Sequence, residues 1–299
     1  MKNVRERLNI KHYWMMLIPG LCLLFVFNTY PLFGSIIAFQ NYNPFKGMLH
    51  SKWVGLENFE FMFQLPDSRQ ILFNTINIAC LKIIAGMVFS LTFAILLNEL
   101  RLKFAKRSIQ TLVYIPHFLS WVILSGILID LFSLEGMVNK VVQWFGVQPI
   151  QFLGSNQLFP FLLIGSDVWK EFGFGAIVYL AALAGINPGL YEAAAIDGAN
   201  RFQRIMYITL PGIVPTIVLL VTLSLGNILN AGFDQIFNMY NPIVYESSDI
   251  IDTYVYRAGL VSQQYSLATA VGLMKSLISF VLIVISNMLA KKFANYRIF

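Results

Sequence analysis

Charged side chains placed inside long apolar stretches are the residues of this sequence best suited to do chemistry. Such a charge is costly unless it is paired or faces a hydrated path. The formal charges balance in a set of six residues: Lys82, Lys170, Lys275, Asp167, Glu171 and Asp234. The sequence therefore predicts either three buried ion pairs that hold helices together, or a polar cavity, and leaves both open.

Amide and aromatic side chains accompany these charges. Asn227, Asn230 and Asp234 recur at i, i+3 and i+7, which predicts one polar face of a helix. Amides and carboxylates can hydrogen-bond polar groups of a solute, and aromatic faces can stack on rings. The residues expected to contact a solute are Asn227, Asn230, Asp234, Trp169, Tyr179, Asp167, Lys170 and Glu171.

Catalytic and metal chemistry find little support. The histidines, His12, His50 and His117, lie far apart, and both cysteines, Cys22 and Cys80, fall in apolar stretches. No GxxxxGK[ST] phosphate-binding loop occurs, so we expect no ATP hydrolysis by this chain. The sequence predicts no catalytic residue, no metal site and no cofactor bound by the chain itself.

The elements that carry these residues are membrane helices. The chain is 57% hydrophobic and only 12% charged, whereas globular proteins are about 25% charged. This composition predicts an all-α, polytopic membrane protein. Six spans can be drawn, at roughly 13–38, 71–98, 109–131, 157–186, 209–235 and 266–290. The first resembles a signal peptide but is too long, so we expect an uncleaved helix.

The net charge of +6 is explained by topology. Thirteen Lys and Arg residues fall on the side of both termini and the 187–208 loop, against five on the other side. Basic loops stay cytoplasmic, so both termini and this loop are predicted there, and nucleic-acid binding is not. The expected organisation is a tail, first span and external segment (1–70), a transmembrane domain (71–290) with a loop at 190–211, and a tail (291–299).

The polar loop after the fourth span has helix signals of its own. Asn187-Pro188-Gly189 is expected to end that span, and Glu192–Ile196 to form a short helix with Glu192 in its first turn. Gly198 can adopt the left-handed conformation that ends a helix, and Asn200 can cap a second helix over 201–208. These signals predict a compact helix–turn–helix, although a plain connector fits them too.

The same loop resembles a known motif. Glu192-Ala193-Ala194, then Gly198, Ile208 and Leu210-Pro211 match the EAA motif of bacterial ABC import permeases. The resemblance implies the type I (MetI-like) permease fold and a coupling surface for a separate ATPase, with Glu192 in contact and Gly198 at the turn. The coupling residues that it implies are Glu192, Ala193, Ala194, Asp197, Gly198, Ile208, Leu210 and Pro211.

Other segments are similar to the sugar-permease branch of that family. Residues 30–59 resemble this branch, and 116–121, 226–233 and 250–257 resemble its members that import oligosaccharides from complex polysaccharides. The resemblance implies a bacterial cell-membrane importer with a second, different permease, two ATPases that use ATP and Mg²⁺, and an extracytoplasmic solute-binding protein. Alternatives are an ABC permease for a non-sugar solute, or an ion-coupled secondary carrier. The EAA motif and the missing inverted repeat disfavour the carrier.

Overall fold

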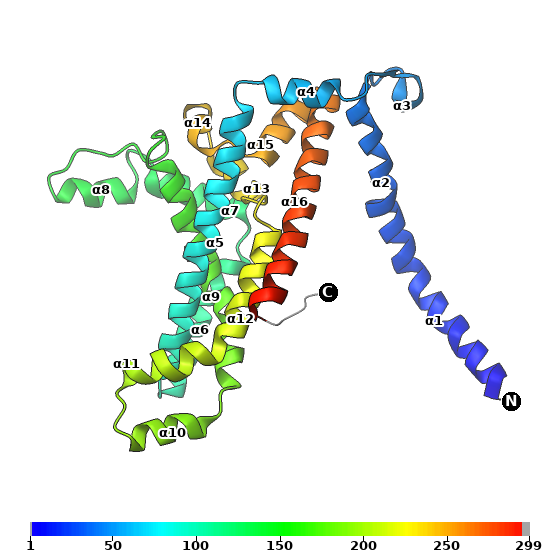
Figure 1. Ribbon diagram of the computed structural model, residues 1–299. Coiled ribbons are helices and arrows are strands. Elements are labelled where there is room, and N and C mark those ends of the chain that lie inside the picture. The colour runs from blue at the N-terminus through cyan, green and yellow to red at the C-terminus, as the bar shows by residue number, and fades with distance from the viewer. Residues whose placement is uncertain (1, 295–299) are drawn as a thin grey trace. The chain divides into compact units, whose positions relative to one another are not determined.

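The computed structural model describes residues 2–294, which are mostly helical (Figure 1). The chain divides into two compact units: Met1–Leu65 with Val255–Met274, and Pro66–Tyr254 with Lys275–Phe299. Residues 295–299, the end of the predicted tail 291–299, lie outside the described residues. The predicted all-α class is confirmed.

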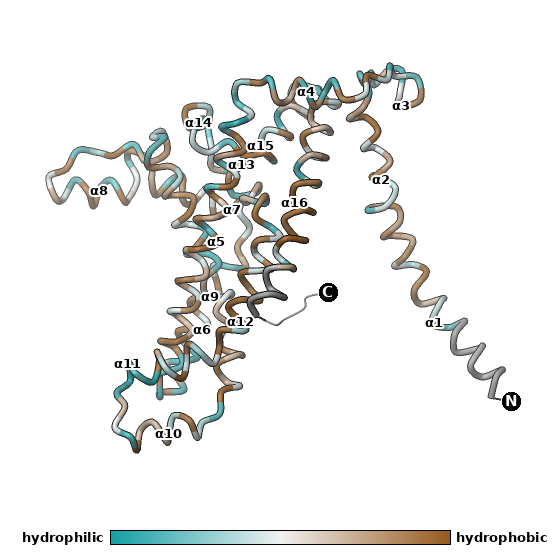
Figure 2. The backbone as a smooth tube through the Cα atoms, viewed as in Figure 1, coloured by the Kyte–Doolittle hydropathy of each residue, from teal (hydrophilic) through white to brown (hydrophobic). Residues whose placement is uncertain are grey.

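The described residues contain five helices long and apolar enough to cross a membrane, or six if one bent pair counts as a span. Figure 2 shows apolar residues along most of these helices. The five are His12–Phe39, Ser68–Glu99, Trp121–Trp144, Arg201–Gly226 and Tyr265–Met288. The bent pair, Phe159–Ala184 with Pro188–Ile196, turns by 70°. This agrees with the predicted number of spans.

The first unit begins with a nearly continuous helical rod. The rod comprises α1 (Lys2–Leu24), a π turn (Phe25–Thr29), α2 (Tyr30–Leu32) and a 3-10 segment (Phe33–Phe39). A small hairpin of β1 (Gln40–Asn41) and β2 (Lys52–Trp53) encloses α3 (Gly47–His50), and α4 (Glu57–Gln64) follows. A turn over 43–47 closes with the Gly47 N–H donating to the Asn43 carbonyl oxygen at 3.0 Å, and Gly47 has φ +71°.

The second unit is a helical bundle in which α5 (Ser68–Glu99) and α9 (Phe159–Ala184) lie side by side. Its other helices are α6 (Lys103–Tyr114), α7 (Trp121–Phe132), α8 (Met137–Trp144), α10 (Pro188–Ile196), α11 (Arg201–Arg204), α12 (Leu210–Gly226), α13 (Phe233–Met239) and α14 (Tyr245–Ser248). Both α15 (Ile251–Tyr256) and α16 (Tyr265–Ala294) continue from one unit into the other. Buried apolar side chains, among them Ile78, Leu124, Phe159 and Leu163, form its core.

The third predicted span is not one helix. A 3-10 turn at Ile115–Phe118 separates α6 from α7, whereas a continuous span was predicted over 109–131. Pro116 has no N–H donor and restricts the residue before it, which explains the interruption. Ser120 restarts the helix by accepting a hydrogen bond from the Ile123 N–H at 3.4 Å.

The fifth predicted span is also broken, so the helix predicted over 209–235 is wrong. α12 ends at Gly226, and a non-helical segment, 227–232, precedes α13. Gly232 has φ +96°, a left-handed conformation that glycine adopts at little cost. By contrast, α9 runs unbroken past its three charges, and its sharp bend comes only after Ala184.

Candidate functional site

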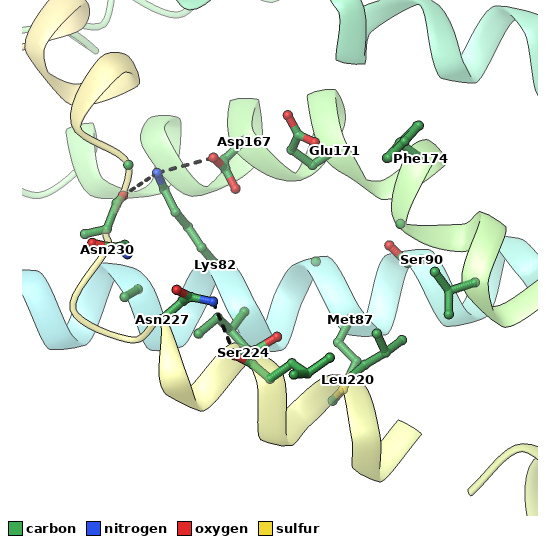
Figure 3. Close-up of a pocket in the computed structure, with 18 of the residues that line it drawn as sticks. Lys82, Met87, Ser90, Asp167, Glu171, Phe174, Leu220, Ser224, Asn227 and Asn230 are labelled. Atoms are coloured by element: carbon green, nitrogen blue, oxygen red, sulfur yellow. Dashed lines mark hydrogen bonds and ion pairs between the residues drawn. The ribbon is translucent and has the colours of Figure 1, made fainter. Parts of the chain in front are cut away.

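A cavity of about 500 Å³ opens in the second unit between α5, α9, α12 and the non-helical segment 227–232 (Figure 3). Its wall combines apolar side chains with a smaller number of polar ones. The polar lining residues are Lys82, Ser90, Asp167, Glu171, Tyr179, Ser224, Asn227 and Asn230. A concave apolar site with a few convergent polar groups is the usual form of a small-molecule site.

Five of the residues predicted to contact a solute lie together in this wall: Asp167, Glu171, Tyr179, Asn227 and Asn230. The two asparagines are exposed, whereas Tyr179 is 3% exposed and mostly packs in the core. The asparagines therefore offer most of the amide surface that a solute could reach.

Three other predicted contacts lie elsewhere. Trp169 lines a separate apolar pocket of about 450 Å³ with residues of α7 and α9. Lys170 is buried, and Asp234 is exposed on α13 outside the cavity. The polar face predicted for Asn227, Asn230 and Asp234 is wrong, because the break at 227–232 interrupts the helix.

Five of the six charges of the spans form ion pairs, and two of their carboxylates also line the cavity. Lys82 Nζ lies 3.3 Å from Asp167 Oδ1, and Lys170 Nζ lies 2.8 Å from Glu171 Oε1. The third lysine, Lys275, pairs with Asp252 at 2.6 Å and not with Asp234. Both readings of the sequence, ion pairs and a polar cavity, therefore describe part of the structure.

A cluster around Glu171 joins the break in the third span to α9. His117 Nδ1 lies 2.7 Å from Glu171 Oε2, and the His117 ring stacks on Phe174 with centroids 3.9 Å apart. Lys170 Nζ donates to the His117 carbonyl oxygen at 2.8 Å. This ammonium satisfies a backbone acceptor that the Pro116 break leaves outside a regular helix.

Sequence reasoning missed four polar residues near the cavity: Ser90, Ser224, Gln235 and Asp252. Gln235 is fully buried and donates to the Leu163 carbonyl oxygen at 2.7 Å and to Ser166 Oγ at 2.8 Å. An amide inside an apolar stretch was a usable signal for Gln235. The serines gave none, since serine is common in membrane helices that bind nothing.

At one end of the bundle, α10 and α11 form the helix–turn–helix expected over the 187–211 loop (Figure 1). Gly198 has φ +79°, and Asn200 and Gln203 form a capping box with bonds of 2.9 and 2.8 Å. The turn and the cap are both confirmed. Glu192, Ala193, Asp197 and Gly198 are exposed, and Ala194 is half-buried.

Two details of this loop differ from the prediction. α10 begins at Pro188, with the Asn187 side chain accepting from the Gly189 N–H at 2.9 Å, so Glu192 is not in the first turn. An asparagine N-cap followed by proline at the first helical position strongly favours a helix start at Pro188. This start decides where α10 begins, although glutamate is also favoured in a first turn. The residues 187–189 therefore begin α10.

The second helix of the loop does not end at Ile208. α11 passes through a π turn (Ile205–Thr209) directly into α12, with Pro211 in the first turn of α12. The Tyr191 hydroxyl lies 2.9 Å from Thr209 Oγ1 and ties α10 to this junction. Ile208 and Leu210 are half-buried, and Pro211 is exposed. The loop is thus continuous with the helix that leads to the cavity.

The exposed surface of this end includes large apolar side chains. Ile196 is 87% exposed and Phe202 is 70% exposed, beside the charged Glu192 and Asp197. An apolar patch rimmed by polar residues is typical of a protein contact surface.

Comparisons with known proteins agree with this geometry. Residues 60–295 match the family described as binding-protein-dependent transport system inner membrane component. "Protein LplB" of Bacillus subtilis is 41% identical over 97% of the chain and 91% of that protein. A polygalacturonan/rhamnogalacturonan transport system permease protein of the same species, YteP, is 40% identical over 100% of the chain and 95% of that protein.

Solved structures give the same picture. A bacterial ABC transporter that imports the acidic polysaccharide alginate has a chain with TM-score 0.88 and 37% identity, over 97% of this chain and 99% of that one. An amino acid ABC transporter, with TM-score 0.52, 11% identity and coverage of 79% of this chain and 98% of its own, shares the fold alone.

Proposed function

Because the chain belongs to the family of inner-membrane components of binding-protein-dependent transport systems, we propose that it is the translocation subunit of an ATP-driven importer of oligosaccharides. The subunit binds and conducts the solute, and a separate ATPase subunit hydrolyses ATP with Mg²⁺. The chain sits in the bacterial cell membrane with both termini in the cytoplasm.

The cargo that we propose is an oligosaccharide released from a polysaccharide. Its relatives support this class, since one is a polygalacturonan/rhamnogalacturonan permease and another belongs to an alginate importer. The cavity supports it as well, because Asn227, Asn230, Asp167 and Glu171 can exchange hydrogen bonds with several hydroxyl groups. Its apolar wall suits the carbon faces of sugar rings.

The observation that carries the proposal is the exposed α10–α11 loop. Its capped ends make it rigid, and its exposed face contains Glu192, Ala193, Asp197 and Gly198. We propose that this face docks on the ATPase, with Ala193 and Ala194 permitting close approach. Ile208, Leu210 and Pro211 then connect the docked loop to α12.

The partners follow from this arrangement. A second, different permease closes the cavity. One ATPase binds the α10–α11 loop of this chain, a second ATPase binds the corresponding loop of the other permease, and an extracytoplasmic protein delivers the sugar. A solved alginate transporter holds a periplasmic protein bound to an alginate pentasaccharide, which supports the last partner. ATP binding turns the cavity outward and hydrolysis resets it inward, so that two states alternate.

Uptake by the assembled transporter tests the proposal. Membrane vesicles containing this chain and its partners should accumulate a radiolabelled tetrasaccharide made from polygalacturonan, rhamnogalacturonan or alginate, only when ATP is present. Gly198→Val should reduce this uptake at least about tenfold, because a β-branched residue is strained at φ +79°. Membrane insertion should not change.

The matched control is Gly198→Asn, since asparagine tolerates the left-handed conformation and should retain most of the uptake. A Cβ at this position meets no atom within 4 Å, so any loss reflects backbone strain or the docked partner. ATP-driven accumulation of radiolabelled histidine with no tetrasaccharide uptake would refute the oligosaccharide proposal. Normal uptake by the Gly198→Val variant would refute coupling through the loop.

A further inference from the structure

The break at 227–232 is a non-helical backbone segment inside the predicted fifth span, 209–235. Its internal hydrogen bonds are short-range turns, such as the Asn230 N–H to the Asn227 carbonyl oxygen at 2.8 Å. In a bilayer, backbone groups outside a regular helix need other partners. Two lysines from other helices supply bonds to this segment.

Lys82 of α5 contacts the end of the break. Its Nζ lies 3.3 Å from Asp167 Oδ1 (Figure 3). It also donates to the Ala231 carbonyl oxygen at 2.8 Å and bonds Gln235 Oε1. These three acceptors match the three N–H donors of an ammonium group. Lys82 is 8% exposed, and a Cβ on Gly232 would lie 2.8 Å from its Nζ. The glycine is therefore also needed to admit the ammonium group.

Lys275 of α16 contacts the middle of the break. Its Nζ donates to Asn230 Oδ1 at 2.8 Å and to Asp252 Oδ1 at 2.6 Å. Because an ammonium group can only donate, the oxygen of the Asn230 amide must face Lys275. The group that Asn230 can offer to the cavity is then its NH₂, with N–H donors.

We propose that Lys82 and Lys275 are positioning residues that clamp the break, and that Lys275 fixes which hydrogen-bonding group Asn230 offers to the cavity beside Asn227. Asn227 Nδ2 donates to the Leu223 carbonyl oxygen at 3.4 Å, so its amide oxygen is the group left to accept from a solute. The clamped segment thus offers an acceptor and a donor three residues apart. Sugar hydroxyls, which both donate and accept, fit such a pair.

The role in sugar recognition rests on the proposed function, but the clamp itself does not. Hydrogen–deuterium exchange of the assembled transporter in nanodiscs, without any sugar, tests the clamp directly. Lys275→Met/Asp252→Asn and Lys82→Met/Asp167→Asn remove each ammonium without leaving its carboxylate charge unpaired. Gly232→Ala changes no charge; it crowds the Lys82 ammonium and also strains the backbone at φ +96°, so it serves as a supporting variant.

We expect backbone amides of 228–236 to exchange at least about tenfold faster in each of the three variants, while α9 is unchanged. Lys275→Arg keeps a cationic donor and should restore slow exchange. Lys140→Met, an exposed lysine on α8, is the matched control and should behave like the wild type. Unchanged exchange in both lysine double variants, or faster exchange throughout the bundle, would overturn the proposal.

Uptake of the galacturonan, rhamnogalacturonan and alginate tetrasaccharides then tests the consequence for recognition. Lys275→Met/Asp252→Asn should raise the half-saturating concentration about tenfold and change the maximal rate less than about twofold, as expected for lost binding. If exchange rises but no tetrasaccharide is carried even by the wild type, the clamp stands and the proposed cargo fails. A lower maximal rate with unchanged half-saturation would contradict the role in recognition.

Discussion

Asn227 and Asn230 are exposed in the cavity, and each uses one end of its amide in a bond within the protein. If the free ends bind sugar hydroxyls, Asn227→Ala and Asn230→Ala should each raise the half-saturating concentration for uptake about tenfold. This corresponds to the roughly 1.4 kcal/mol of one hydrogen bond. Concentration-dependent uptake measures it.

The ATPase activity of the same preparations serves as the reference. It should stay coupled to transport in both variants, because neither asparagine lies near α10 or α11. Gln143→Ala, an exposed amide on α8, is the matched control and should leave uptake unchanged. Wild-type half-saturation in both asparagine variants would remove them from the binding site.

The charged residues of the cavity could be predicted from the sequence, but the residues with which the charges form ion pairs could be predicted less well. A charge within an apolar stretch signals a pair or a hydrated path from composition alone, and both readings hold for Asp167 and Glu171. The choice of partner depends on packing between helices. Lys275 bonds Asp252, which lies on a short helix outside the apolar stretches, so charge counting alone pointed to Asp234.

At the scale of elements, glycines decide how closely α9 packs against its neighbours. A Cβ at Gly173 would lie 2.5 Å from the Val113 carbonyl oxygen, whereas at Gly165 it would meet nothing within 4 Å. Gly173→Ala should therefore destabilise the bundle by about 1–3 kcal/mol, because backbone must move. Gly165→Ala on the same helix should be neutral or slightly stabilising.

Thermal unfolding of the purified transporter in detergent measures this difference. The Gly173→Ala variant should unfold at a lower temperature than the wild type, and the Gly165→Ala variant should not. Equal midpoints for the two variants would mean that α6 can shift away from α9 at no cost.

The positions of the helices could be predicted from hydropathy, whereas the breaks within them could be predicted less well. Pro116 was a usable signal for the interruption of the third span, since proline in a helix interior removes a backbone N–H and clashes with the preceding turn. It was not a sufficient one, because Pro19 and Pro215 lie inside α1 and α12. The break at 227–232 had no comparable signal. Its asparagines are spaced like one helix face, and the bonds that hold it open come from Lys82 and Lys275 on other helices.

At the scale of the whole molecule, the cavity and the α10–α11 loop, the two proposed functional regions, share helices. α9 carries Asp167 and Glu171 in the cavity and leads into α10, while α12 rises from α11 to Asn227. Near the loop, α12 also packs against the turn between α9 and α10, since a Cβ on Gly212 would lie 2.9 Å from Ile186 Cδ1. A push on the α10–α11 loop therefore has a direct structural route to both walls of the cavity.

This route has a use only if the loop lies on the ATPase side of the membrane. The excess of basic residues near the termini and the 187–208 loop predicts that it does. In a Cys22→Ser/Cys80→Ser background, Ala195→Cys on α10 should react with a membrane-impermeant maleimide only after cells are permeabilised. Gln148→Cys, in the exposed loop after α8, should react in intact cells. Labelling of Ala195→Cys in intact cells would reverse the orientation and place the loop beyond the reach of any cytoplasmic ATPase.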